Sequence, residues 1–286
     1  MKKTLFRIFK RILIFLLIVL AIAGGILAYN MWLNQTFVTT FYTVTTDKDI
    51  ENMRIVELSD LHLREYGEKN ADLVERIRNL KPDIIAVAGD MNIDENPDYT
   101  VVLELMEQLV EIAPVYYGPG NHEWAGIYGW HYSAMADDIA ATGAHFLLQQ
   151  YEDVEINGNK LRIGGIFEWP REQLEWPNSQ KVVDALDAQK QDTSDVYTIL
   201  ICHCPEVFYT SLQNIQVDLA ISGHAHGGLV RLPHTDGLWS TSQGFLPKYT
   251  SGVRQIGEST VVISRGLGDS EPYPRIFNQP ELVVID

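Results

Sequence analysis

The chain has 286 residues, of which 46% are hydrophobic and 21% are charged, and its formal net charge is −16. This composition is that of a globular protein, and its acidity argues against DNA or RNA as the main partner, since nucleic-acid binding needs clustered Lys and Arg. The two cysteines, Cys202 and Cys204, are too few for a disulfide framework and are interpreted as small core residues on either side of His203.

The N-terminal segment joins a basic leader to a long apolar run. Residues 1–33 contain five basic residues and no acidic one, and Asn30 is the only strongly polar residue from 12 to 33. About 22 apolar residues are enough to cross the bilayer core as a helix, and basic flanks stay in the cytoplasm. We therefore expect one transmembrane helix within residues 1–33, which places the rest of the chain on the extracytoplasmic face of the cell membrane. The alternative is a cleaved signal peptide, with Ala21-Ile22-Ala23 as its cleavage site.

The rest of the chain alternates strand and helix patterns after a tether at residues 34–52, which merges into a first edge strand at 37–42. Further strands are expected at 55–58, 84–88, 115–117, 154–156, 161–166, 197–202, 219–222, 229–232, 261–264 and 282–285. Helices are expected at 72–80, 99–112, 130–141 and 182–189. The sequence offers no linker that would split residues 53–286, so we expect one α/β domain of two packed sheets with helices outside.

Candidate metal ligands follow five of these strand patterns directly. The five segments are Asp60-Leu61-His62, Gly89-Asp90, Gly120-Asn121-His122, His203 and Gly223-His224-Ala225-His226. Ligands of α/β proteins gather beyond the carboxyl ends of strands, so one fold can bring all five segments to a common rim. Imidazole and carboxylate groups bind divalent transition metals, and such a site accepts Mn, Fe or Zn. Seven ligands, with one carboxylate free to bridge, predict two metal ions and the hydrolysis of phosphate esters.

The charge of this ligand set suits a phosphate substrate. Two divalent ions bring four positive charges, of which Asp60 and Asp90 neutralise two, so the site keeps a charge of about +2 that attracts a phosphate. Glycines 89, 120 and 223 beside the ligands are expected to permit tight turns and close backbone approach.

These motifs resemble those of the calcineurin-like metallophosphoesterase superfamily. The order Asp-x-His, Gly-Asp, Gly-Asn-His-Glu, a lone His and Gly-His-x-His carries the resemblance over roughly residues 53–286. Three tail segments are similar to the membrane-associated bacterial branch: His226-Gly227-Gly228, Ser264-Arg265-Gly266-Leu267-Gly268 and Pro280-Glu281-Leu282. The resemblance implies a four-layer αββα sandwich, in which helices flank two mixed β-sheets, with a dinuclear metal centre at the rim.

The resemblance also implies a role for each site residue. The first metal would be held by Asp60, His62 and His226, the second by Asn121, His203 and His224, and both by the bridging Asp90. A hydroxide between the ions would attack phosphorus in line. His122 is not a ligand in the family and would stabilise the transition state or protonate the leaving oxygen.

The chain departs from the family's pattern at three positions. Ala225 and Leu229 stand where many relatives have Thr and Gln, and the second change removes a polar group near the rim. Relatives often place an Asp three residues after the bridging carboxylate, where it orients the general-acid histidine. Ile93 occupies that place here, so Asp94 and Glu123 both stay open as the partner of His122.

Other polar and aromatic residues carry weaker signals. His131, His145 and His234 are interpreted as structural, and Arg265 and Arg275 as residues within reach of a substrate phosphate. Five aromatic residues near the motifs fit either ordinary loop packing or a rim that grips an apolar substrate; they are Trp124, Tyr128, Trp130, Trp169 and Trp176.

The sequence thus predicts a membrane-anchored, metal-dependent phosphoric ester hydrolase. Its substrate would be a phosphodiester, pyrophosphate or monoester, with a phospholipid or a sugar nucleotide favoured over nucleic acid. One alternative is a catalytically silent scaffold of the same fold that binds a protein partner, but no ligand is missing here as it would be in such a scaffold. A zinc peptidase is a poorer fit, because the chain lacks His-Glu-x-x-His.

Overall fold

The apolar strand segments pair into two six-stranded mixed sheets in the computed structural model, which describes residues 2–93, 98–129, 134–232, 235–269 and 275–286. The first sheet has the order β1 (Val38–Tyr42), β14 (Glu281–Ile285), β2 (Ile55–Leu58), β3 (Ile84–Val87), β4 (Val115–Tyr117) and β5 (His145–Phe146). The second has the order β12 (Gly252–Ile256), β13 (Ser259–Ile263), β9 (Leu219–Ser222), β8 (Tyr197–Cys202), β7 (Asn159–Ile166) and β6 (Gln150–Ile156). β10 (Trp239–Ser240) and β11 (Gly244–Phe245) form a separate small hairpin.

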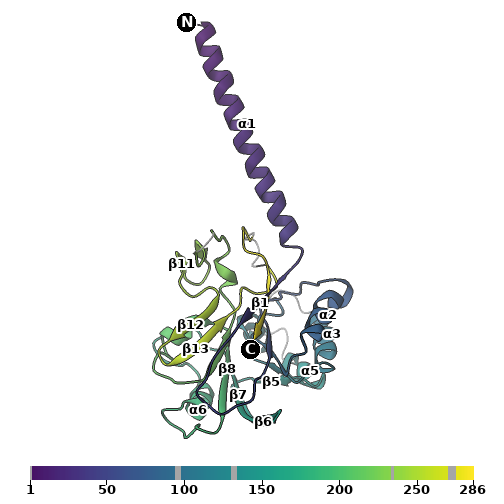
Figure 1. Cartoon of the computed structure of the whole chain (residues 1–286), viewed down its shortest axis with the longest axis vertical. Helices are drawn as coiled ribbons and strands as arrows, with labels where there is room; N and C mark the ends of the chain where they lie inside the picture. Colours follow the sequence, from purple (N-terminus) through teal and green to yellow (C-terminus); the bar gives the residue numbers. More distant parts are fainter. Residues whose placement is uncertain (1, 94–97, 130–133, 233–234, 270–274) are drawn as a thin grey trace.

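Apolar side chains of the two sheets fill three cores, which define four layers. One core lies between the sheets and takes inward residues of both, such as Ile84 and Ile199. A second packs the outer face of the first sheet against α2 (Ala71–Leu80), α3 (Thr100–Val110) and α5 (Met135–Ala141). A third packs the outer face of the second sheet against α6 (Pro177–Leu186). Figure 1 shows the helices on the two outer sides. The expected αββα sandwich is confirmed.

Parallel pairing within each sheet places the candidate site. β2, β3, β4 and β5 run parallel in the first sheet, and β7, β8, β9 and β13 run parallel in the second. Their carboxyl ends therefore lie along a common edge of each sheet. All four residues of β3 and all six of β8 are buried, as in parallel strands that are covered on both faces.

The N-terminal segment forms one long helix, α1 (Lys2–Leu33), which projects from the body in Figure 1. The helix Lys3–Leu33 is long and apolar enough to cross a membrane, and an 18-residue window of it has a mean hydropathy of 2.9 with none of its residues buried inside the protein. A signal sequence has the same properties. The polar Asn30 is buried at the base of the helix, where its side chain accepts a hydrogen bond from the backbone N–H of Phe277.

Several elements differ from the expectation. α4 (Asn121–Gly129) is a helix where the sequence suggested a loop, and α5 begins at Met135, while residues 130–133 of the expected helix lie outside the described part of the chain. α6 begins earlier than expected because Pro177 is accommodated in its first turn. Residues 229–232 are not a strand and make only isolated bridges, through Leu229 and Val230. The strands β5, β10 and β11 have two residues each, which is too short for a sequence pattern to reveal.

Among the described residues, the core between the sheets contains an unpaired carboxyl group. Glu57, in the middle of β2, is fully buried, and neither of its carboxyl oxygens has a hydrogen-bond partner. Burial, and then the charges of Glu281 and Asp60, raise its pKa well above the ordinary 4.5. Because the folded protein binds this proton more tightly than the unfolded chain does, the contribution of Glu57 to stability is present below about pH 4.5 and is lost as the pH rises.

We predict that Glu57→Gln removes this loss, because an amide does not titrate. The free energy of unfolding of the variant relative to the native chain should increase from pH 5 to pH 8. Denaturant titrations of the full chain in detergent, followed by tryptophan fluorescence with a chelator present, measure this difference. A difference that is constant with pH would contradict the assignment.

Candidate metal centre

All five ligand-bearing segments meet where the strands of the two sheets end. Asp60 and His62 follow β2, Asp90 follows β3, and Asn121 opens α4 after β4. From the second sheet, His203 follows β8, and the segment from Gly223 to His226 follows β9. The two sheets are linked directly at this point, since Nδ1 of His203 lies 2.6 Å from the carbonyl oxygen of Ala88.

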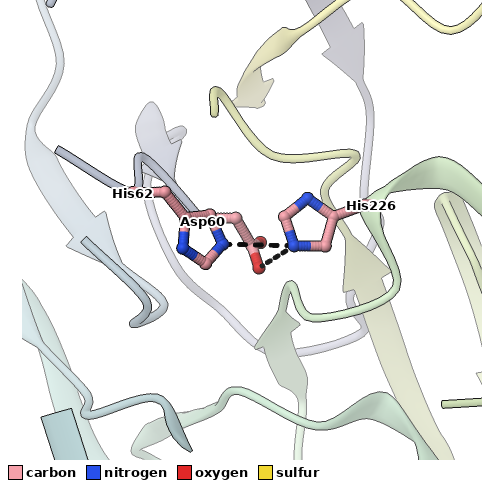
Figure 2. A group of neighbouring side chains, drawn as sticks. All are labelled: Asp60, His62 and His226. Carbon is pink, nitrogen blue, oxygen red and sulfur yellow. Dashed lines mark hydrogen bonds and ion pairs between the residues drawn. The ribbon is translucent and has the colours of Figure 1, made fainter. Parts of the chain in front are cut away.

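The first group of donors is Asp60, His62 and His226, shown in Figure 2. Nε2 of His62 lies 3.2 Å from Nε2 of His226, which in turn lies 3.3 Å from Oδ1 of Asp60. Donors at neighbouring positions around an ion, with bonds of about 2.1 Å, lie about 3.0–3.4 Å apart. The spacing therefore fits a bound transition-metal ion.

The second group is Asp90, His203 and His224, whose ligand atoms lie within 4.8 Å of one another. Nε2 of His203 is 3.0 Å from Oδ2 of Asp90 and 3.9 Å from Oδ1 of Asp60, so this imidazole faces both carboxylates. A third possible grouping joins Asp90 to His62 and His122. His62 belongs to the first and third groups and Asp90 to the second and third, so the third group connects the other two.

A buried polar atom at the site, Oδ1 of Asn121, has no hydrogen-bond partner among the described residues. Buried polar atoms are almost always paired, because an unpaired one costs about 1–3 kcal/mol. An amide oxygen carries lone pairs that can coordinate a cation, so the donor set fits divalent metal binding better than it fits a closed hydrogen-bond network.

Burial keeps most of the imidazoles neutral. It lowers the pKa of His62 to about 3 and, together with the nearby His62 and Arg275, holds the pKa of His226 well below its ordinary value. The pKa of His224 is lowered in the same way, by burial and by His203. A neutral imidazole offers the lone pair that a metal needs.

His203 is the exception among the imidazoles. Burial is the largest single effect and lowers its pKa, but the charge of Asp90, the hydrogen bond to it, the charge of Asp60 and the bond to the Ala88 carbonyl together outweigh burial and raise the pKa to about 10. Burial raises the pKa of Asp60 to about 6, although the charge of His203 opposes this shift. Without a cation between them, the buried carboxylates are thus compensated by a proton on His203; a bound metal would replace that proton.

The backbone around the ligands is strained. Five of the candidate ligands have positive φ angles between 47° and 69°, namely Asp60, His62, Asp90, His224 and His226. A left-handed conformation costs a non-glycine residue roughly 1–2 kcal/mol, and such residues cluster at functional sites. The sequence gives no indication of these angles.

Glycines allow the ligand loops to approach one another, as expected. A Cβ atom on Gly89 would lie 2.2 Å from the backbone nitrogen of Gly120, and one on Gly120 would lie 2.2 Å from Oδ1 of Asp90. A Cβ on Gly223 would collide with the side chain of Ser59. Any larger side chain at these positions would therefore push the ligand loops apart.

Glu123 holds two ligand loops together. Its buried carboxylate accepts hydrogen bonds from the backbone N–H groups of Asp90 (2.7 Å), Met91 (2.8 Å) and Gly120 (2.8 Å), and from the hydroxyl of Tyr117 (2.9 Å). The sequence left Glu123 open as a partner of His122, but these bonds are all to other groups. Asp94, the other candidate partner, lies outside the described residues.

His122 lies at the mouth of the site. Its side chain is 25% exposed, whereas those of Asp90 and His203 are at most 3% exposed, and its Nε2 is 3.7 Å from Oδ2 of Asp90. Its ring meets that of His62 edge to face, with 4.9 Å between centroids. Its backbone N–H donates to Oδ1 of Asp90, which fixes the start of α4 beside the ligands.

Arg275 supports the site from beneath and does not reach outward. It is fully buried, and its guanidinium donates to the carbonyl of Gly268 and lies 3.1 Å from Nδ1 of His226. The neighbouring Asn278 donates to the carbonyl oxygen of His226 at 2.6 Å. The expectation that Arg275 could contact a substrate phosphate is therefore wrong, because its donors serve the ligand loop. Arg265 pairs with the buried Glu281 at 3.0 Å.

The remaining candidates lie away from the donor groups or pack beside them. His145 is on β5, where Nδ1 is 2.7 Å from Glu152, and both cysteines are buried and free. The ring of Trp124 packs in tilted contacts against those of Phe167 and Trp176. These three rings form an aromatic cluster next to the start of α4. His131, His234 and Trp130 lie outside the described residues, as does the side chain of Tyr128.

The chain is similar to several known proteins. Residues 53–228 match the sequence model of the calcineurin-like phosphoesterases. The chain is 27% identical to the metallophosphoesterase YkuE of Bacillus subtilis (strain 168), over 92% of this chain and 90% of that one. It is 28% identical to a metallophosphoesterase of Aquifex aeolicus (strain VF5), over 85% and 89% respectively. A transmembrane protein with a metallophosphoesterase domain from Danio rerio is 24% identical over 76% of this chain and 52% of its own length.

We predict that Glu123→Ala destabilises the protein strongly. It leaves at least three buried backbone N–H groups without an acceptor, at about 1–3 kcal/mol each, and about 2–4 °C of Tm is lost per kcal/mol in a domain of this size. Thermal unfolding of the full chain in detergent measures the shift. The matched control is Glu155→Ala on the exposed end of β6, which should change Tm little. Equal shifts in the two variants would show that Glu123 does not hold the loops.

Proposed function

The chain belongs to the calcineurin-like phosphoesterase family, and from that premise we propose that it is a membrane-anchored hydrolase of phosphate esters with a dinuclear metal centre. The observation that carries this proposal is the convergence of buried imidazole and carboxylate donors around Asp90. We propose residues 53–286 as the catalytic domain, residues 34–52 as a tether with the first edge strand, and residues 1–33 as the anchor.

We assign the seven donors to two ions that share one carboxylate. The first ion would be held by Asp60, His62 and His226, the second by Asn121, His203 and His224, and both by Asp90. The donor groups around Asp60 and around Asp90 support this division, as does the unpaired Oδ1 of Asn121. Mn, Fe and Zn all suit such mixed ligands.

The ligand set leaves the site able to attract an anion. Only Asp60 and Asp90 among the seven donors carry negative charge, whereas imidazole and amide ligands are neutral. Divalent ions held here would supply Lewis acidity for the phosphoryl group and an activated water as nucleophile. A monoester, a phosphodiester and a pyrophosphate all present the phosphoryl oxygens that such a site binds.

We propose that His122 acts on the substrate and not on the metals. The side chain of His122 is 25% exposed, compared with 0% for His203 and 5% for His226. It lies beside Asp90, on the solvent side of the donor groups. An imidazole there can donate a hydrogen bond to a phosphoryl oxygen or a proton to the leaving oxygen. Glu123 fixes its position indirectly, because that carboxylate holds the loop on which His122 follows Asn121.

Anchoring of the domain outside the cytoplasm is part of the proposal. The apolar helix α1 is long enough to span a bilayer, and its basic leader favours the cytoplasmic side. The Danio rerio relative carries the words transmembrane protein in its name, which supports association with a membrane. A phospholipid or a sugar nucleotide at the membrane surface would be within reach of such a site.

The ligand assignment predicts which variants lose activity. Asp90→Ala and His224→Ala should lower turnover of an aryl phosphodiester or monoester, assayed with Mn²⁺ and the full chain in detergent, by more than the roughly 10–100-fold typical of groups that only support metal ligands. His145→Ala, which removes a histidine outside the site, should retain activity. Undiminished turnover in Asp90→Ala would reject the proposed centre.

If His122 acts on the substrate, its removal should have a different effect from the removal of a metal ligand. His122→Ala should lower kcat by about 10²–10⁴-fold, the usual contribution of a general acid, while the metal content stays that of the native chain. Elemental analysis and steady-state kinetics on the same preparation provide both values. Loss of one ion together with activity would make His122 a ligand instead.

A further inference from the structure

A strip of short backbone pairings connects the base of α1 to the β10–β11 hairpin. The backbone N–H of Phe277 donates to the side chain of Asn30 on α1, and the adjacent Ile276 bridges Val230. Leu238 donates to Val230, and Leu246 donates to Leu238. This segment of the chain, residues 229–246, lies beyond the part that matches the family's sequence model.

The strip exposes large apolar side chains. Phe245 is 83% exposed and Leu246 is 69% exposed, while Leu232 and Phe277 are 46% and 44% exposed. We call these four residues the apolar edge. Outside α1, Phe245 and Leu246 are the most exposed of the large hydrophobic residues in the described part of the chain. Water-exposed phenylalanine and leucine side chains in one strip indicate a surface that is covered in the working protein.

The position of the apolar edge indicates what covers it. Phe277 is bonded to Asn30 near the end of the helix proposed to cross the bilayer, so it must lie close to the membrane surface when α1 is inserted. In Figure 1, β11 lies at the end of the body from which α1 departs. A bilayer crossed by α1 would therefore extend over the same end of the body.

The charge of this segment also differs from that of the body. Residues 34–286 carry 17 basic and 38 acidic residues, but residues 229–256 carry three basic residues, Arg231, Lys248 and Arg254, and one acidic residue, Asp236. Lys248, two residues after Leu246, is exposed. Arg254 pairs with Asp236, and Arg231 donates to the carbonyls of Gly227 and Thr235. Lys248 is therefore the base that faces solvent beside the apolar edge, where it suits a surface of anionic lipid headgroups.

We propose that the apolar edge inserts into the outer surface of the membrane that α1 crosses. Its phenylalanine and leucine side chains enter the interface between headgroups and acyl chains, and α1 and the edge together fix the orientation of the body. The edge also adjoins the metal centre, because Asn278, next to Phe277, donates to the carbonyl of the proposed ligand His226. The proposal rests on the proposed anchoring and deepens the proposed function: the site is held at the membrane surface, where it can take phosphoesters borne by lipids.

Depth-dependent quenching tests the proposal on the full chain. Both native cysteines are fully buried, so a single introduced cysteine can carry a fluorophore. Phe245→Cys and Leu246→Cys report on the apolar edge, Leu17→Cys reports on α1, and Glu155→Cys on the exposed end of β6 is the control. Each labelled chain is reconstituted into vesicles of phosphatidylethanolamine and phosphatidylglycerol, with and without lipids that carry a nitroxide near the headgroup.

The proposal expects several-fold stronger quenching at 245 and 246 than at 155. Quenching at 17 without quenching at 245 and 246 would overturn the inserted edge while leaving the anchor intact. The fluorophores at 245 and 246 could instead be shielded from water only at high protein concentration and not be quenched by the nitroxide lipids. That result would assign the apolar edge to contact with a second copy of the chain and would also overturn the proposal. Quenching at 245 and 246 in a preparation without phosphoesterase activity would support the edge and reject the proposed function, so the two failures can be told apart.

Discussion

Two carboxylates are buried at the junction of the sheets, and the residues around them must compensate their negative charge. Asp60 and Asp90 are at most 3% exposed and face the same imidazole, that of His203. Buried negative charge is costly unless it is paired, and this structure supplies either a proton on His203 or room for cations among donors spaced 3.0–3.3 Å apart. A metal bound at this point would therefore compensate the negative charge that the fold buries there.

The surrounding structure is organised to keep these charges together. Parallel strands in both sheets deliver the ligand segments to one edge, and the bond from His203 to Ala88 joins the sheets there. Glu123 holds the loops of Asp90 and Gly120, and Arg275 with Asn278 fixes the loop of His226. Because Asn278 adjoins Phe277, which contacts the base of α1, the support of the centre is continuous with the proposed membrane anchor.

The sequence predicted the elements whose physical signal is local. Strands 55–58, 115–117, 197–202 and 219–222 have the expected bounds, because short, mostly apolar runs that are followed by a polar or glycine residue mark buried strands. It did not reveal the positive backbone φ angles of the ligands, the hydrogen bonds of Glu123 to the ligand loops or the burial of Arg275. Each of these depends on contacts between distant segments. Glu123 did have a signal, as part of Gly-Asn-His-Glu, but its function in holding loops requires coordinates.

Location of the metals by anomalous X-ray scattering, in crystals of the full chain grown with Mn²⁺, is the most direct test of a shared carboxylate. The account predicts two anomalous peaks about 3.5–4 Å apart, the usual separation in two-metal sites, with Asp90 in contact with both. A single peak, or two peaks of which only one contacts Asp90, would contradict it.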